Sequence, residues 1–321
     1  MRWITGCLFL LADFTALSQE TSSTDASKAN KEPDYIWAFS SPKLINANTV
    51  EMTPKGVLEF KVTHNFGDIA GNSGGIKNFF GLDNATDVRI GFQYGLSKKV
   101  NLVAARAKGA SLSELYELGI KYRFMQQAND SRHPLSVALF ANTVASTMTA
   151  APDSISFGVG TAFDNFSDRL SQTIQLLIAR RFGKISFQLS PTIVHANYVV
   201  KNDKNTLFAL GGGLRLPVKG RFGLLLDYFH SFRSKQTIDF FKSLRSPRFP
   251  DGVRFYDALG VGIELLTEGH VFHLNFTNAT DILENRFIPR TTTSWGKGQY
   301  RWGFTISRDF DMLYKKKYRK K

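Results

Sequence analysis

Residues 87–96, DVRIGFQYGL, decide the fold. Apolar side chains occupy every second position of this stretch, and polar residues or glycine lie between them. Because successive side chains of a β-strand point to opposite faces, this alternation predicts a strand with one apolar and one polar face. The polar face carries Arg89 and two glycines at positions where a soluble sandwich would place a second apolar layer.

The same alternation recurs about twelve times along the chain. It is clear at residues 56–66, 87–96, 114–124, 169–182, 206–216, 221–232, 256–266, 270–277 and 299–307, and weaker at 100–108, 135–147 and 185–200. Each segment is long enough to cross a bilayer as a tilted strand of roughly 9–11 residues.

The connections between these segments alternate in length. Tight turns fall at residues 97–99, 183–184, 217–220 and 267–269, and long connections at 67–86, 148–168, 234–255 and 279–298. Outer-membrane barrels have short periplasmic turns, long outer loops and an even number of strands. We therefore expect an all-β fold, an antiparallel transmembrane β-barrel of about twelve strands over residues 56–310. Irregular links at 109–113, 125–134 and 201–205 leave the strand count open by two, and a secreted sandwich stays open as the alternative.

The two ends of the chain have their own compositions. Residues 1–18 combine Arg2, an apolar stretch, and Ala16 and Ser18 before a cleavage site, which predicts a secretory signal peptide; a buried N-terminal helix is the alternative. Residues 19–55 are expected to form a periplasmic leader, and residues 311–321 a basic periplasmic tail. An even strand count then puts both termini in the periplasm and the barrel in the outer membrane. Cys7 is the only cysteine, so the mature chain is expected to have none.

The charge balance is strongly basic, with 41 Lys and Arg against 27 Asp and Glu, a net charge of +14. Alone, this excess is typical of proteins that bind nucleic acid or an anionic membrane. The periplasmic address of the tail, which supplies six of these charges, excludes nucleic acid as a partner. We expect outer-membrane lipid and lipopolysaccharide as partners, with other envelope proteins as further candidates.

Three stretches carry a family resemblance: PKGVLEF at 54–60, HNFGD at 64–68 and NFFGLDNATDVRIG at 78–91. Together they resemble an uncharacterised family of outer-membrane β-barrel proteins from the Bacteroidota, known as a domain of unknown function. The resemblance is sharpest over residues 44–102 and looser as far as Phe310. It implies an outer-membrane barrel, and it carries no assigned activity and no catalytic residue.

The predicted inner faces carry charged side chains, seven basic and four acidic. They are Lys61, Arg89, Lys121, Arg123, Arg181, Arg215 and Arg301, with Glu59, Glu117, Asp227 and Glu264. A net charge of about +3 favours a pore or binding cavity for anions. Equally, paired charges fill narrow barrels, so a salt-bridged and closed lumen stays open.

Enzymatic and metal chemistry find little support. The six histidines are scattered, so we expect no metal site and no cofactor. A membrane lipase would need a serine beside His230, and the adjacent Ser231 points to the opposite face.

We expect no enzyme. The leading hypothesis is a passive pore or binding protein for small solutes, with anions favoured by the interior. The alternative is a non-conducting structural or complex-partner barrel, and an outer-membrane lipase comes third. The loop at 234–255 could fold inward as a constriction or present a surface outside.

Overall fold

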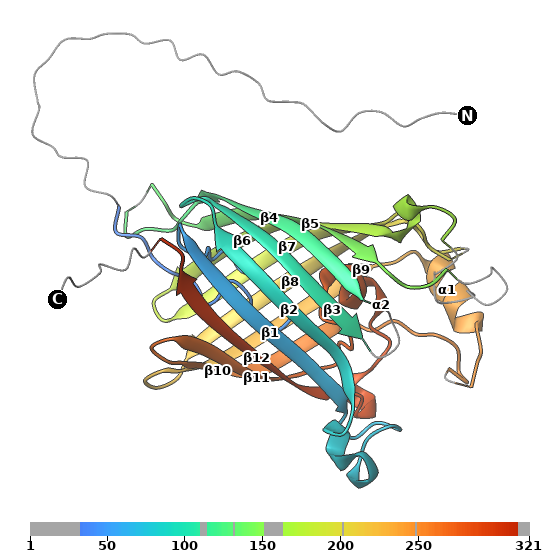
Figure 1. The fold of residues 1–321 in the computed structure, drawn as a ribbon. Coiled ribbons are helices and arrows are strands. Elements are labelled where there is room, and N and C mark those ends of the chain that lie inside the picture. Colours follow the sequence, from blue (N-terminus) through green and yellow to red (C-terminus); the bar gives the residue numbers. More distant parts are fainter. Residues whose placement is uncertain are drawn as a thin grey trace, which may run out of the picture. The chain divides into compact units, whose positions relative to one another are not determined.

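The chain forms one closed β-barrel (Figure 1). The computed structural model describes residues 33–109, 114–130, 132–150, 163–200, 202–247 and 249–313. Twelve antiparallel strands within these residues each pair with their neighbours in the chain, and the first pairs with the last. The expected barrel of about twelve strands is therefore confirmed. The expected signal peptide and most of the basic tail lie outside the described residues.

The strands follow one another around the barrel in chain order. The first six are β1 (Val57–Asp68), β2 (Ala85–Gly95), β3 (Val100–Gly109), β4 (Leu115–Met125), β5 (Ser136–Ser146) and β6 (Leu170–Phe182). The second six are β7 (Ile185–Ala196), β8 (Thr206–Pro217), β9 (Phe222–Phe232), β10 (Ala258–Leu266), β11 (His270–Thr277) and β12 (Arg301–Asp311). Closure leaves no unpaired strand edge, which a bilayer could not hydrate.

Short helices occupy the connections. They are the α-helices α1 (Lys235–Ser243) and α2 (Glu284–Arg290) and the 3₁₀ helices η1 (Ile76–Gly81), η2 (Phe166–Arg169) and η3 (Trp295–Lys297). Among the helices of the described residues, none is long and apolar enough to cross a membrane.

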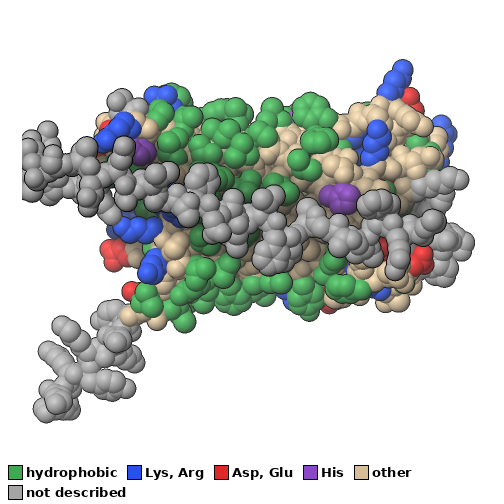
Figure 2. All heavy atoms as spheres, turned by 90° about the horizontal axis from the view of Figure 1, so that it is seen from above, with side chains coloured by type: hydrophobic (Ala, Val, Ile, Leu, Met, Phe, Trp, Pro, Cys, Tyr) green, Lys and Arg blue, Asp and Glu red, His purple; other side chains and the backbone are tan. Residues whose placement is uncertain are grey.

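The two faces of the wall differ in polarity, as the alternation predicts. Outward side chains are mainly apolar and exposed; Leu118, for example, exposes 69% of its surface. Figure 2 shows this hydrophobic cover along the barrel, with charged side chains gathered at its two ends. The inward side chains alternate with them and are mostly buried.

The two ends of the barrel are distinct. The turn end carries the connections at 96–99, 126–135, 183–184, 218–221 and 267–269, and the loop end carries the others. The start of β1 and the end of β12 meet at the turn end, where the Met312 amide donates to the Gly56 carbonyl at 2.9 Å. The α1 loop stays outside the barrel at the loop end (Figure 1), which answers the question that its sequence left open.

Two segments that are not strands fill the interior. The N-terminal plug, residues 38–54, enters from the turn end, and the loop plug, residues 278–293, folds inward from the loop end with α2. Their apolar side chains form one buried cluster with the inner wall, including Leu44, Val50, Phe140, Phe229 and Phe287.

The N-terminal plug differs from the leader expected for residues 19–55, because its residues lie inside the barrel. The physical reason is the width of the barrel. Inner side chains fill a barrel of about eight strands, whereas twelve strands enclose more space. Many inner residues here are small, such as Gly213 and Ser190, so other segments must occupy the space.

Candidate functional site

All eleven predicted charged residues lie on inner strand faces, and most of them are paired. Salt bridges join Lys61 to Glu59 (3.1 Å), Arg89 to Glu117 (2.7 Å), Arg215 to Glu264 (2.7 Å) and Arg301 to Asp68 (2.9 Å). Arg123 and Arg181 are partly exposed near the turn end. The remaining two, Asp227 and Lys121, bind the N-terminal plug.

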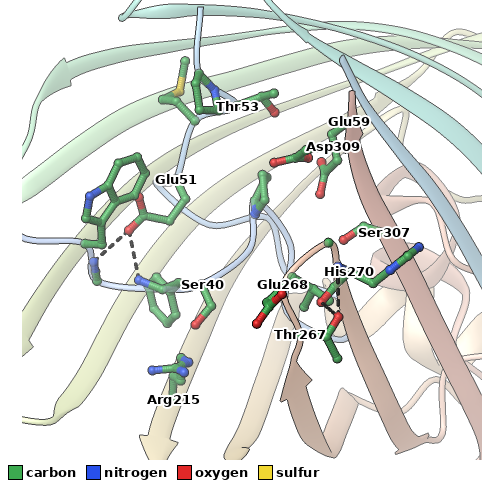
Figure 3. Close-up of a pocket in the computed structure, with 18 of the residues that line it drawn as sticks. Ser40, Glu51, Thr53, Glu59, Arg215, Thr267, Glu268, His270, Ser307 and Asp309 are labelled. Atoms are coloured by element: carbon green, nitrogen blue, oxygen red, sulfur yellow. Dashed lines mark hydrogen bonds between the residues drawn. The ribbon is translucent and has the colours of Figure 1, made fainter. Parts of the chain in front are cut away.

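The N-terminal plug is a hairpin whose two arms lie side by side. The Thr49 amide donates to the Pro42 carbonyl at 2.9 Å, and the Leu44 amide donates to the Ala47 carbonyl at 2.8 Å, which closes the tip. At the base, one Glu51 carboxylate oxygen accepts the amides of Ala38 and Phe39 at 2.8 and 2.9 Å (Figure 3). Burial raises the pKa of the Glu51 carboxyl.

Asp227 on β9 holds the tip of this hairpin. One of its carboxylate oxygens accepts the backbone amides of Ile45, Asn46 and Ala47 at 3.1, 2.6 and 2.9 Å. Its other oxygen accepts the Asn46 side-chain amide at 2.9 Å. Asp227 is fully buried, so these hydrogen bonds replace the water that the carboxylate would otherwise bind.

Lys121 on β4 holds both arms of the hairpin. Its ammonium group donates to the carbonyls of Pro42, Thr49 and Glu51 at 3.2, 3.0 and 3.2 Å. A lysine has three donors, and the plug backbone satisfies all of them. Lys121 has no exposed surface, so its charge is bound entirely by the protein.

Neutral amides complete the seat of the plug. Gln188 accepts the Val50 amide at 3.0 Å and donates to the Asn48 carbonyl at 2.6 Å. Asn101 accepts the Thr53 amide at 2.8 Å and donates to the Thr53 carbonyl at 2.9 Å. Sequence analysis missed these two residues because an uncharged polar side chain on an inner strand face is unremarkable.

Glycines let the plug lie close to the wall. A Cβ atom at Gly260 on β10 would come within 2.8 Å of Ile45 Cγ2, and one at Gly213 on β8 within 2.7 Å of Leu44 Cδ1. Both distances are too short for carbon atoms in contact. Mid-strand glycine on the polar face was visible in the sequence, and close backbone approach explains it.

The turn between β4 and β5 holds the chain where it enters the barrel. The Ile36 amide donates to the Gln127 carbonyl at 2.7 Å, and the Asn129 amide donates to the Asp34 carbonyl at 3.1 Å. This contact explains why the connection at 126–135 is longer than the other turns at this end, an irregularity that the sequence showed without its cause.

The two plugs also bind each other. Lys43 in the N-terminal plug forms a buried salt bridge with Glu284 in the loop plug at 2.7 Å. The same Glu284 oxygen accepts the Asn48 amide at 3.0 Å. On the loop side, the Phe287 ring packs edge-on against Phe229 of β9, with ring centroids 5.2 Å apart. Segments that enter from both ends therefore occupy the interior.

The charges of the inner wall nearly balance. Asp68, Asp87 and Asp309 also face the interior, and the predicted set omitted them. With them and Asp311, which follows Asp309 on the same face of β12, the described inner strand faces carry eight acidic and seven basic side chains. The expected net charge of about +3 is therefore wrong, because acidic residues near the strand ends were left out of the count.

A cavity of about 530 Å³ remains at the turn end, between the N-terminal plug and the wall. Figure 3 shows Glu51 and Ser40 of the plug on one side and Glu59, Asp309 and Ser307 of β1 and β12 on the other. Arg215 and His270 also line it. Its lining mixes acidic, basic and aromatic groups.

A protein family described as "Membrane bound beta barrel domain (DUF5777)" matches residues 39–310. The chain belongs to this family. The match includes most of the N-terminal plug, so the plug is part of this membrane-bound β-barrel domain.

Solved structures with a similar fold include outer-membrane proteins. The KdgM porin is 7% identical, with a TM-score of 0.45 over 79% of this chain and 99% of that one. The NanC porin is 7% identical, with a TM-score of 0.44 over 79% and 98%. An outer membrane channel from Pseudomonas putida F1 is 12% identical, with a TM-score of 0.44 over 81% and 98%. At these identities the likeness is one of fold. A search of curated proteins found no match.

The partner of His230 is an aspartate. The imidazole Nδ1 lies 2.9 Å from Asp257 on the outer face, and Tyr228 donates to the same carboxylate. No serine hydrogen-bonds His230 in the described part of the chain, so a catalytic pair is not assembled there. The described residues also contain no cluster of three or more His, Cys, Asp or Glu side chains that could hold a metal.

Proposed function

We propose that the protein is an outer-membrane channel that its own N-terminal segment closes at rest. The turn end faces the periplasm in this proposal, and both termini lie on that side. One observation carries it. The described strands form a complete wall by pairing with one another, and side chains of that wall bind the backbone of the N-terminal plug. The plug can therefore leave without breaking the barrel.

The chemistry of the seat supports a removable plug. Asp227, Lys121, Gln188 and Asn101 are polar groups that water can solvate once the plug has left. Exchange of a protein hydrogen bond for one to water changes the free energy by only about 0.5–1.5 kcal/mol. An apolar seat would instead resist hydration.

The solutes of this channel are small. Because the wall charges nearly balance, the described wall gives no electrostatic reason to prefer anions, and we propose small polar solutes without a preferred charge. No catalytic step is part of this function.

The second candidate is a non-conducting barrel that serves as a complex partner in the envelope. The filled interior favours it, because Lys43 and Glu284 join the two plugs inside the barrel. In this case the chain before the plug would contact another envelope protein while the barrel remained closed.

The lipid environment is a further part of the proposal. The apolar outer band would contact lipid tails. Arg106 and Lys108 lie on the outer face of β3 near the loop end, where both pair with Glu114 and remain about half exposed. Cationic groups at this end of the outer face can form charge-assisted hydrogen bonds with the phosphates of lipopolysaccharide.

Conductance in planar bilayers tests the proposal. Full-length wild-type protein should be silent for most of the time, and Asp227→Ala should open more often because it removes the acceptor for the hairpin tip. Asp309→Ala removes the same charge from the wall without a hydrogen bond to the plug, and should behave as wild type.

A reversible lock sharpens the experiment. Cysteines replacing Leu44 and Gly213, in a Cys7→Ser background, are the pair to test for a disulfide lock, because a Cβ atom at Gly213 would lie 2.7 Å from Leu44 Cδ1. Oxidation should abolish openings, and reduction should restore them. If Asp227→Ala frees the plug but produces no conductance, the channel is refuted in favour of the closed partner barrel.

A further inference from the structure

The loop end of the barrel gathers four arginines around a small cavity of about 50 Å³. Arg169 lies just before β6, Arg233 just after β9, and Arg286 and Arg290 lie one turn apart on α2. The cavity is also lined by Val194 and Leu207, which are buried on the inner faces of β7 and β8. It therefore belongs to the barrel interior and not to the lipid-facing surface.

Two of the four arginines have partners within the protein. Arg233 lies 3.2 Å from an Asp203 carboxylate oxygen, and its guanidinium stacks 3.9 Å above the Phe255 ring. Arg169 donates to the Ser146 carbonyl at 3.3 Å and lies over the Phe163 ring. These contacts fix both side chains at the edge of the cavity.

Arg286 and Arg290 differ from Arg169 and Arg233 in their hydrogen-bond partners. Within the described ranges, no carboxylate or carbonyl oxygen accepts a hydrogen bond from either guanidinium. The Nε atom of Arg286 is buried and has no partner. The acidic groups on the cavity rim are already engaged, because Asp203 pairs with Arg233 and Asp168 accepts backbone amides. Burial of an unpaired charged donor is costly, so a missing acceptor is indicated.

The two guanidiniums also repel each other. They are four residues apart on one helix, a spacing that puts like charges on the same face. Burial and the neighbouring Arg290 lower the pKa of Arg286 to about 10, which still leaves it protonated at neutral pH. A counter-ion between them would remove both the repulsion and the unpaired donor.

We propose that this cavity binds one small oxyanion of phosphate size, held by Arg286 and Arg290. The volume exceeds the roughly 30 Å³ that a water molecule occupies in the liquid, and is far below the 300 Å³ or more of a typical organic-ligand pocket. Two planar guanidiniums suit a tetrahedral anion, because each can donate two parallel hydrogen bonds. Arg233 and Arg169 add positive charge at the edge.

The source of the anion is a free solute on the loop-end side. The inner-face residues that line the cavity separate it from the lipid, so a lipid headgroup has no route to it along the outer face. A bound oxyanion would tie α2 to the wall and stabilise the loop plug. The site does not depend on channel opening, because it requires only that α2 and the loop plug lie inside the barrel.

Calorimetric titration of inorganic phosphate into full-length protein, purified in detergent without lipopolysaccharide, tests the site. The wild type should bind one phosphate with saturation. Arg286→Gln and Arg290→Gln should each weaken binding at least about tenfold, since each removes charge-assisted hydrogen bonds. Arg180→Gln, an exposed arginine on the outer face of β6 that belongs to no proposed site, should leave binding unchanged.

Several results would overturn the proposal. One is the absence of saturable binding by the wild type, and another is unchanged binding by the Arg286→Gln, Arg290→Gln double variant. Displacement of phosphate by lipopolysaccharide would refute a free solute as the source. If the variants fail to fold, the wild type alone decides: phosphate, but not chloride at equal ionic strength, must raise its unfolding temperature.

Discussion

Substitution of Asp227 by alanine should loosen the N-terminal plug without opening the barrel wall. The change removes the oxygen that accepts the amides of Ile45, Asn46 and Ala47, at distances of 2.6 to 3.1 Å. A buried donor without an acceptor costs about 1–3 kcal/mol, and water can enter the space that the carboxylate leaves. At the lower limit of about 1 kcal/mol each, three donors without an acceptor destabilise the seated plug by about 3 kcal/mol. This free energy corresponds to about a 100-fold increase in the population of the displaced plug.

The assay is the rate at which a buried thiol reacts with a soluble maleimide. Ser41→Cys, in a Cys7→Ser background, places one thiol in the plug at a position that is 2% exposed. If opening is fast, the labelling rate follows the population of the open form. Asp227→Ala should therefore raise the rate about 100-fold.

Two further variants decide whether the reasoning is right. Asp227→Asn keeps a carbonyl oxygen facing the three amides, so its labelling rate should rise by less than about tenfold. Asp309→Ala has no hydrogen bond to the plug and should label as the parent does. Equal rates for Asp227→Ala and Asp309→Ala would refute the assignment of Asp227 as the anchor of the hairpin tip.

Three other predictions concern the seat and the outer face. Lys121→Met should also speed labelling, because three plug carbonyls lose their donor, whereas Lys108→Met on the outer face should not. Gly260→Ala should destabilise the seated plug by about 1–3 kcal/mol through contact with Ile45, whereas Gly212→Ala meets only one atom at 3.8 Å and should have little effect in the same assay. His230→Ala should leave the hydrolysis of phospholipid vesicles at the wild-type level, and a measured loss of hydrolysis would revive the lipase hypothesis.

The weaker parts of the sequence pattern had a structural cause. Alternation is indistinct at 135–147 because inner-face residues such as Ala138 and Phe140 are apolar, and both contribute to the buried cluster. An inner face that packs against a plug needs apolar side chains, so it loses the contrast with the lipid face. A strand with two apolar faces in a predicted barrel thus indicates an occupied interior.

The sequence also does not show what the interior charges bind. Strand alternation places Asp227 and Lys121 on inner faces, but it cannot tell whether such a group meets water, an opposite charge or a backbone. Arg89 and Glu117 lie 28 positions apart and become partners only through the register of β2, β3 and β4.

What the sequence by itself determined is the barrel: the period of two, the alternating turns and loops, and the apolar outer face. These are local properties, because each follows from the direction of side chains along one strand. Only the tertiary structure decided that two plugs occupy the interior of the barrel. Residues 38–54 have no period of their own, and their conformation is imposed by partners such as Asp227, some 180 residues away in the chain. Contacts between such distant residues depend on the completed barrel, which a local pattern does not contain.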